Sequence, residues 1–367
     1  MSTNGLKPLK IGDLTAPIPI VQGGMGVGIS LSGLASAVAA EGGIGVIAAA
    51  GIGMMEPDGY TNFLEANKRA LRNQIRKARE LTKGIIGVNI MVALSNFADL
   101  VTTSIEEGID IIFSGAGLPL NLPQYLGDNC KTKLVPIVSS SRAARIICKK
   151  WLDQFDYLPD AVVVEGPKAG GHLGFKRDEL ADPNYSLEKL VPAIVKELQP
   201  FEDIKQAPIP VIAGGGIYSG EDIYHFLQLG ASGVQMATRF VATHECDASI
   251  DFKKTYLDAT PEDTVIITSP VGMPGRALRN QFIDDVNSGS KKPFKCPYHC
   301  IITCKHKDSP YCIAMALLNA QQGKLKQGFA FAGQNVHRVK EIVSVKELMT
   351  SLMNEYETAA QANASKY

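Results

Sequence analysis

His172 is the residue of this chain whose surroundings best suit acid–base chemistry. It lies in the segment EGPKAGGHLG, residues 165–174, and follows two consecutive glycines, Gly170 and Gly171. A neutral imidazole has a pKa of about 6.5, so it can exchange a proton near neutral pH, and its cation can hold an anion. A single histidine is more often structural or exposed, but the flanking glycines argue against a packed core position. We therefore predict that His172 stands on a flexible loop and has a catalytic or substrate-orienting role.

Two further segments predict a phosphate site. Residues 210–216 read PVIAGGG, so an apolar run ends in three glycines. Backbone N–H groups of such a turn can face an anion without interference from side chains. Residues 233–240 read GVQMATRF and add the hydroxyl of Thr238 and the charge of Arg239. Either segment alone would be an ordinary strand-to-helix turn, whereas the pair predicts a phosphate site.

Three other positions suit contacts with a flat, polar ring. The segment QGGMG, residues 22–26, lets the backbone approach a ring closely at Gly24, Met25 and Gly26. Asn89 ends the run GVN, and Gln334 lies in the run AGQN. Each amide can pair with a ring edge or a phosphate. A buried asparagine and a helix-capping glutamine are the alternatives, so neither residue is specific alone.

Short apolar runs alternate along the chain with segments of helical periodicity. Most runs are continuously apolar, which is the pattern of parallel strands buried on both faces. The predicted strands are 17–22, 44–49, 85–90, 109–114, 134–139, 161–165, 210–213 and 233–236. The predicted helices between them are 32–40, 61–83, 142–151, 186–198 and 220–229.

This alternation predicts a (β/α)8 TIM barrel, because eight parallel strands are the number that closes one. An open doubly wound sheet is the alternative fold. We assign the barrel to residues 1–258 and a C-terminal helical and irregular appendage, packed on the barrel, to residues 259–367. Within the appendage we expect an irregular stretch over 259–309 and helices over 314–322 and 343–362.

Composition and charge exclude several classes of protein. The chain has 37 basic and 37 acidic residues, and this balance argues against nucleic acid as a partner. Residues 42–55 are nearly all apolar but fall short of the roughly 20 residues that a membrane span needs. Residues 1–13 contain no apolar signal core, and the clustering of cysteines does not resemble a disulfide framework. We therefore predict no membrane association and a cytoplasmic location.

Taken together, these segments resemble the nitronate monooxygenase family (formerly 2-nitropropane dioxygenases), which includes the flavin-dependent enoyl-ACP reductase II enzymes. The similarity runs from residue 17 to about residue 240 and resumes at Gly333 and Gln334. It implies a flavin-bearing barrel with His172 at the position of the family's catalytic histidine. It also implies FMN contacts at Asn89, Glu165, Gly170 and Gly216, and a phosphate held by Gln235, Met236, Ala237 and Thr238. To these predicted cofactor contacts we add Gly171, Gly215, Gln334 and the backbone of Gly24, Met25 and Gly26.

The chain departs from the family pattern at two positions. Lys168 stands where the family usually has glutamate, which reverses a charge four residues from His172. Ala237 replaces a usual glycine beside the phosphate. Neither departure removes the expectation of a flavin.

The resemblance implies an FMN-dependent oxidoreductase, and we expect a nitronate monooxygenase, which oxidises alkyl nitronates with O2. Residues 332–334 look closer to that branch of the family. An NAD(P)H-dependent enoyl-thioester reductase of the enoyl-ACP reductase II type is the alternative. A flavin-binding regulatory protein without turnover is a further alternative, against which His172 and its intact glycines argue. The expected partners are a small-molecule substrate and a second copy in a homodimer.

A cluster of cysteines follows the predicted barrel. If residues 296–304 are helical, three thiols spaced by four residues share one face. Thiolates placed in this way can hold an iron–sulfur cluster or zinc, and a neighbouring flavin favours iron–sulfur as its electron partner. The spacing is not a common signature, and buried thiols without a metal are the alternative. We predict that one centre is held by Cys296, Cys300, Cys304 and Cys312, with His299 and His306 as additional ligands.

Overall fold

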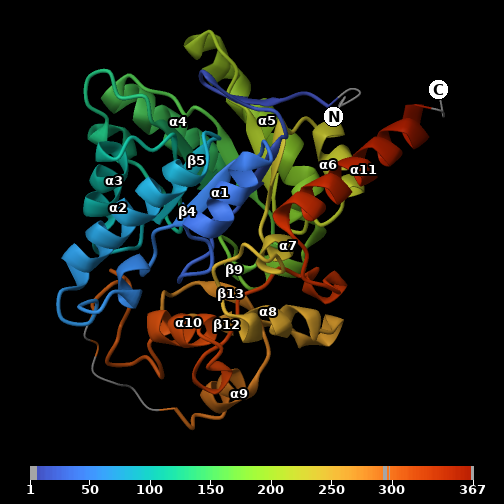
Figure 1. Cartoon of the computed structure of the whole chain (residues 1–367). Coiled ribbons are helices and arrows are strands. Elements are labelled where there is room, and N and C mark those ends of the chain that lie inside the picture. Colours follow the sequence, from blue (N-terminus) through green and yellow to red (C-terminus); the bar gives the residue numbers. More distant parts are fainter. Residues whose placement is uncertain (1–5, 292–295, 297, 365–367) are drawn as a thin grey trace.

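The structure, a computed structural model, describes residues 6–291, 296 and 298–364 (Figure 1). Eight parallel strands form a single sheet in the order β3-β11-β10-β8-β7-β6-β5-β4. A parallel bridge between Val21 and Ile44 joins its two edges, so the sheet closes into the predicted (β/α)8 barrel. Its strands are β3 (Ile20–Gln22), β4 (Gly45–Ala48), β5 (Ile86–Met91), β6 (Ile111–Gly115), β7 (Lys133–Val138), β8 (Val162–Glu165), β10 (Val211–Gly214) and β11 (Gly233–Met236).

The strands form where the sequence is continuously apolar, because each is covered on both faces. Every residue of β4, β6 and β10 is buried. One face fills the barrel interior with a cluster that includes Val46, Phe113 and Ile212, and the other packs on the surrounding helices. All eight predicted strands are confirmed, with small differences at their ends.

A hairpin that the sequence did not reveal precedes the barrel. Its strands β1 (Leu9–Ile11) and β2 (Leu14–Ala16) pair antiparallel. Leu9 and Ile11 belong to the same buried cluster as the interior residues of the barrel. The hairpin therefore extends the apolar interior of the barrel.

Helices surround the barrel and alternate with its strands. The α-helices of this part are α1 (Ser32–Ala40), α2 (Phe63–Leu81), α3 (Phe97–Glu106), α4 (Ser141–Phe155), α5 (Leu187–Lys205), α6 (Gly220–Gln228), α7 (Thr238–Val241) and α8 (Ile250–Leu257). Short 3-10 helices lie in the loops at η1 (Ile52–Met55), η2 (Leu122–Tyr125), η3 (Glu179–Ala181), η4 (Pro183–Tyr185), η5 (Pro261–Asp263), η6 (Leu325–Gln327) and η7 (Val336–Arg338). In the described part of the chain, no helix is long and apolar enough to cross a membrane.

The C-terminal region is more regular than its composition indicates. The stretch 259–309, expected to be irregular, contains β12 (Thr264–Thr268), β13 (Pro274–Leu278) and α9 (Gln281–Asn287), so that expectation is wrong for these elements. The two predicted C-terminal helices are confirmed as α10 (Ile313–Gln321) and α11 (Val345–Ala364). Helix α11 packs against α6 on the outside of the barrel (Figure 1).

A second, antiparallel sheet joins this region to the barrel. Strand β13 pairs on one side with β12 and on the other with β9 (Gly171–His172), a short strand that follows β8. Figure 1 shows these strands below the barrel, with β9 nearest to it, then β13, and β12 level with helices α8 and α10. The C-terminal region therefore supplies part of the structure that carries His172.

Candidate active site

A cavity of about 500 Å³ opens at the carboxyl ends of the barrel strands. This is the end at which barrels of this type carry their active sites, because loops from all eight strands converge there. The predicted site residues that line it are Gly24, Met25, Gly26, Asn89, Glu165, Gly170, Gly171, His172, Gly215, Gly216, Gln235, Met236, Ala237 and Thr238. Gln334 does not line it: its side chain is exposed, and its backbone N–H donates to Lys168 O at 3.1 Å.

One end of the cavity is a cradle of backbone groups. Gly215 and Gly216 have φ of 98° and 95°, in the left-handed region that favours glycine. A Cβ atom at Gly215 would lie 2.8 Å from Gly166 O, so a side chain there would displace the neighbouring loop. Among the described residues, the N–H groups of Gly216 and Thr238 have no protein acceptor. Free N–H groups on a glycine turn fit the phosphate of a cofactor such as FMN.

The side chains around this cradle differ in part from those expected. The guanidinium of Arg239 turns away from the cavity: its Nη1 donates to Tyr218 O at 3.2 Å and lies 3.6 Å from Glu355 Oε1. The Thr238 hydroxyl lines the cavity and accepts the Gly333 N–H at 3.2 Å. The side chain of Arg239 is therefore not part of the cavity wall, where its charge was expected from the sequence.

Asn335 ties the C-terminal loop to the cradle, and sequence reasoning missed it. Its Nδ2 donates to Gly216 O at 2.6 Å, and its side chain lines the cavity. The neighbouring Gln334 was the predicted cofactor contact, and both amides lie in the same run AGQN. Nothing in the sequence distinguishes which of two adjacent amides faces inward.

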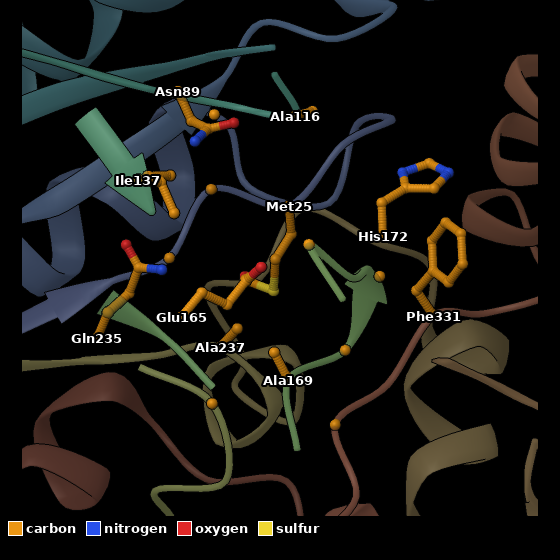
Figure 2. A pocket seen from close by; sticks show the side chains of 18 of the residues that line it. Met25, Asn89, Ala116, Ile137, Glu165, Ala169, His172, Gln235, Ala237 and Phe331 are labelled. Atoms are coloured by element: carbon orange, nitrogen blue, oxygen red, sulfur yellow. The ribbon is translucent and has the colours of Figure 1, made fainter. Parts of the chain in front are cut away.

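Two amides and a carboxyl group face the middle of the cavity. Figure 2 shows the side chains of Asn89, Gln235 and Glu165 around a common space, with Met25 beside them. In the described part of the chain neither amide has a protein hydrogen-bond partner. Burial raises the pKa of Glu165 to about 7. Unpaired amides at a cavity wall suit the polar edge of a flavin ring or its ribityl chain.

His172 stands at the opposite end of the cavity on a strand, not on the flexible loop expected from its glycines. Strand β9 pairs His172 with Gly275 of β13. The imidazole Nε2 lies 2.7 Å from the Ser269 hydroxyl, and the ring packs edge-on against Phe331 at 5.1 Å between centroids. Burial lowers the pKa of His172 to about 4. The imidazole is therefore neutral at physiological pH.

The glycine-rich segment before His172 is held in place by a buried arginine. Nη1 of Arg276 donates to Pro167 O at 2.6 Å and to Ala169 O at 2.7 Å. A Cβ atom at Gly170 would lie 2.5 Å from the carbonyl carbon of Ala332, so this glycine permits close backbone packing. Arg276 lies more than a hundred residues from its partners, and no local pattern in the sequence links them.

The remaining wall of the cavity is mostly apolar. Among the described residues that line the cavity, none is lysine, arginine or aspartate. The apolar part of the wall includes Val27, Leu118, Met273, Leu317 and Phe331. Glu165 and His172 are the acidic and the basic residue among those that line the described cavity.

The predicted metal centre is wrong for the described residues. Within these residues, no group of three or more His, Cys, Asp or Glu side chains is placed to hold a metal ion. The reason is that the segment is not helical: Ile301 forms an antiparallel bridge with Leu94, and His299 has a φ of 46°. Burial raises the pKa of Cys300 to about 12, which favours the protonated thiol. A small cavity of about 30 Å³ is nevertheless lined by Cys296, Cys300, Cys304 and Cys312, all with free thiols.

The closed barrel and the cavity at its strand ends define a TIM-barrel enzyme with a cofactor-sized site. Residues 7–355 match the family model for nitronate monooxygenase, so the chain belongs to the nitronate monooxygenase family. The chain is an oxidoreductase, as the relatives in this family are.

Three relatives illustrate the breadth of this family. A probable nitronate monooxygenase of Bacillus subtilis (strain 168) is 26% identical over 370 residues, covering 92% of this chain and 95% of that protein. A (3aS,4S,5R,7aS)-5-hydroxy-7a-methyl-1-oxo-octahydro-1H-indene-4-carboxyl-CoA dehydrogenase of Mycobacterium tuberculosis is 30% identical over 276 residues, or 74% of this chain. The match spans 66% of that longer relative, just under two thirds of its length. The structure of FabK from Thermotoga maritima is similar with a TM-score of 0.73 and 29% identity, covering 95% of this chain and 96% of that one.

Proposed function

We propose that this chain is an FMN-dependent nitronate monooxygenase, which oxidises alkyl nitronates with O2. Two parts of the cavity support the cofactor. The free N–H groups of Gly216 and Thr238 fit its phosphate, and the unpaired amides of Asn89 and Gln235 fit its ring or ribityl chain. Bound FMN would take electrons from the substrate and pass them to O2.

The observation that carries the proposal is the neutral imidazole of His172 at the edge of the cavity. A neutral nitroalkane is a carbon acid, and its proton must leave before it is a nitronate. Because burial keeps the pKa of His172 near 4, the ring is free to accept that proton at neutral pH. Away from the cradle the described cavity wall is mostly apolar and includes Val27, Leu118 and Phe331, which suits the apolar body of a nitroalkane.

An NAD(P)H-dependent enoyl-thioester reductase is the second candidate, and the likeness to FabK over 95% of the chain favours it. In that reaction His172 would donate a proton to the carbon next to the carbonyl. With a pKa of about 4, only on the order of one imidazole in a thousand carries that proton at pH 7. A reductase would therefore draw its proton from this small fraction, whereas a His172 base needs no prior protonation.

Anaerobic rapid mixing of the flavin-loaded protein separates the two candidates. We expect the flavin absorbance to bleach with an alkyl nitronate and not with NADH or NADPH. Bleaching by a pyridine nucleotide alone would replace the monooxygenase with the reductase. Denatured protein should first release a yellow chromophore that co-elutes with FMN, and a chain that fails to bind FMN on reconstitution would contradict both candidates.

A substitution of His172 tests its role as the base. We expect His172→Gln to bind FMN with unchanged affinity and to lose at least about a hundredfold in kcat/KM with neutral nitroalkanes. With preformed nitronates, whose proton has already left, the loss should be smaller. Equal activity of the variant and the parent protein on neutral nitroalkanes would show that His172 is not the base.

A further inference from the structure

Ser269 occupies a tightly fixed position behind His172. It is the first residue after β12, in the turn that leads to β13, and it is 3% exposed. Its backbone is bonded twice within that turn: Ser269 N–H donates to Met273 O at 3.1 Å, and Gly272 N–H donates to Ser269 O at 2.9 Å. The hydroxyl itself accepts the Val271 N–H at 3.1 Å. The backbone of the second sheet therefore determines where this hydroxyl lies.

The same hydroxyl identifies which ring nitrogen of His172 faces the cavity. Nε2 of His172 lies 2.7 Å from Ser269 Oγ. His172 lines the cavity, but Ser269 does not. Nε2 is thus engaged with a group behind the cavity wall, and Nδ1 is the ring nitrogen left for a substrate.

We propose that Ser269 is a positioning residue, which holds Nε2 of His172 so that Nδ1 receives the substrate's proton. This inference rests on the proposed role of His172 as a base. Before transfer the ring carries its proton on Nε2, which donates to Ser269 Oγ, and Nδ1 is an open acceptor. The C–H bond of the nitroalkane breaks, its electron pair stays on the substrate as the nitronate, and the proton forms the Nδ1–H bond. The resulting imidazolium keeps its Nε2–H bond to the hydroxyl.

A hydroxyl in this place has a consequence that a carboxylate would not have. Ser269 orients the ring without a negative charge that would favour the imidazolium ion before the substrate arrives. Three ionisable groups lie on the elements next to His172: Glu165 on β8 and Tyr256 on α8 line the same cavity, and Arg276 on β13 pairs with Gly171. Of these, Arg276 donates to Pro167 and Ala169, and the Tyr256 hydroxyl donates to Phe331 O. In the described part of the chain none of them hydrogen-bonds to the imidazole, which leaves Ser269 as its partner.

The test compares Ser269→Ala with Ser269→Thr, which keeps the hydroxyl. We expect Ser269→Ala to lower kcat/KM for neutral nitroalkanes about tenfold, the effect of one lost hydrogen bond of ordinary strength. Ser269→Thr should retain most of the activity, and both variants should bind FMN with the parent's affinity. Ser104→Ala is the matched control, because Ser104 is also fully buried and donates its hydroxyl to Leu100 O, far from the cavity.

Nitrogen-15 NMR of the ring gives a readout that is independent of turnover. The chain has six histidines, so the signals absent from His172→Gln identify those of His172. We expect a protonated Nε2 and an unprotonated Nδ1 in the parent protein, and a mixture of the two tautomers in Ser269→Ala. If Ser269→Ala does not fold, Ser269→Cys, whose thiol is a weak hydrogen-bonding group, provides the same comparison.

The outcomes distinguish this inference from the proposed function. Unchanged kcat/KM and unchanged ring signals in Ser269→Ala would overturn the inference, even if His172→Gln is inactive with nitroalkanes. A protonated Nδ1 in the parent protein would also overturn it. If His172→Gln remains fully active, the proposed function fails first, whatever the ring signals show.

Discussion

The two ends of the cavity are built in different ways. The cradle at Gly215 and Gly216 comes from two consecutive barrel units, whose strands β10 and β11 are neighbours in the sequence and in the sheet. The His172 end is built across the chain, because β9 pairs with β13, which lies about a hundred residues later. The first depends mainly on local backbone conformation, although Asn335 and Gly333 of the C-terminal region are bonded to it, and the second depends on the pairing of β9 with β13. Substitutions should therefore affect the two ends to different extents.

The largest effect is expected in the cradle. Gly215→Val should weaken FMN binding about a hundredfold or more, because a Cβ at φ 98° would meet Gly166 O at 2.8 Å. Fluorescence titration of the apoprotein with FMN measures this change. Gly108→Val is the matched control: Gly108 also has a positive φ, of 65°, but nothing lies within 4 Å of the position that a Cβ would take there. If both variants lose the same FMN affinity, the loss comes from the strain of a side chain at positive φ and not from contact between the new side chain and the cradle.

The second prediction concerns the His172 end. Arg276→Met should lower turnover about tenfold and reduce the free energy of unfolding by roughly 2 kcal/mol, because two buried carbonyls, of Pro167 and Ala169, lose their donor. FMN affinity should change less than turnover, because the free N–H groups of Gly216 and Thr238 belong to the barrel units, although the segment that Arg276 holds borders the cradle at Gly215. Arg279→Met, at an exposed arginine next to the same strand, is the control. An Arg276→Met protein that loses FMN as readily as Gly215→Val would remove the distinction between the two ends.

The same difference explains how much could be predicted from the sequence. The eight strands and the cradle glycines were predictable because continuous apolar runs and consecutive glycines are local patterns. The strand that carries His172 was not, because His172 and Gly171, which has a φ of 77°, form a strand only through pairing with Gly275 and Arg276. Two glycines before a histidine indicate a flexible loop when the distant partner is unknown.

The direction in which a side chain points was the other feature that the sequence could not predict. Arg239 follows the cradle strand in sequence, yet Tyr218 and Glu355 draw its guanidinium outward. Gln334 and Asn335 are adjacent amides, and only the fold shows that Asn335 reaches Gly216. The cysteine prediction was wrong for a related reason: the regular spacing indicated one helical face, but the described residues of 296–304 form no helix, and Ile301 makes an isolated bridge with Leu94.

A third prediction uses the titration of His172. Its folded pKa, about 4, lies below the unfolded value of about 6.5, so the folded state prefers the neutral ring. Between those two values the unfolded chain binds more protons, so this group destabilises the folded protein as the pH falls from 6.5 towards 4. We therefore expect the parent protein to lose more free energy of unfolding over this range than His172→Gln does. Parallel denaturant titrations at pH 7 and pH 5 would reveal the difference, and identical pH dependence would show that the ring is not buried as described.

The smallest expected effect concerns Lys168, the residue that departs from the family's glutamate. Its side chain lies across the cradle: a Cβ at Gly216 would be 2.9 Å from Lys168 Cβ and 3.0 Å from Lys168 Cδ. The side chain is exposed and passes beside Gly216, so we expect its ammonium to act on a phosphate bound at the cradle, from which the guanidinium of Arg239 turns away. We expect Lys168→Glu to raise the Kd for FMN several-fold at low ionic strength, because an exposed charge acts over a Debye length of about 10 Å at 0.1 M salt.

A salt titration distinguishes this local effect from a general change in charge. Lys196→Glu makes the same change in net charge at an exposed position of α5, on the outside of the barrel, and should leave the Kd unchanged. Added salt should weaken FMN binding in the parent protein, because screening reduces the attraction between the ammonium and the phosphate. In Lys168→Glu the attraction has become a repulsion, so the same salt should bring its Kd closer to the parent value. Parallel salt curves for the two proteins would show that Lys168 does not act on the phosphate, and the cradle would then rely on its backbone N–H groups alone.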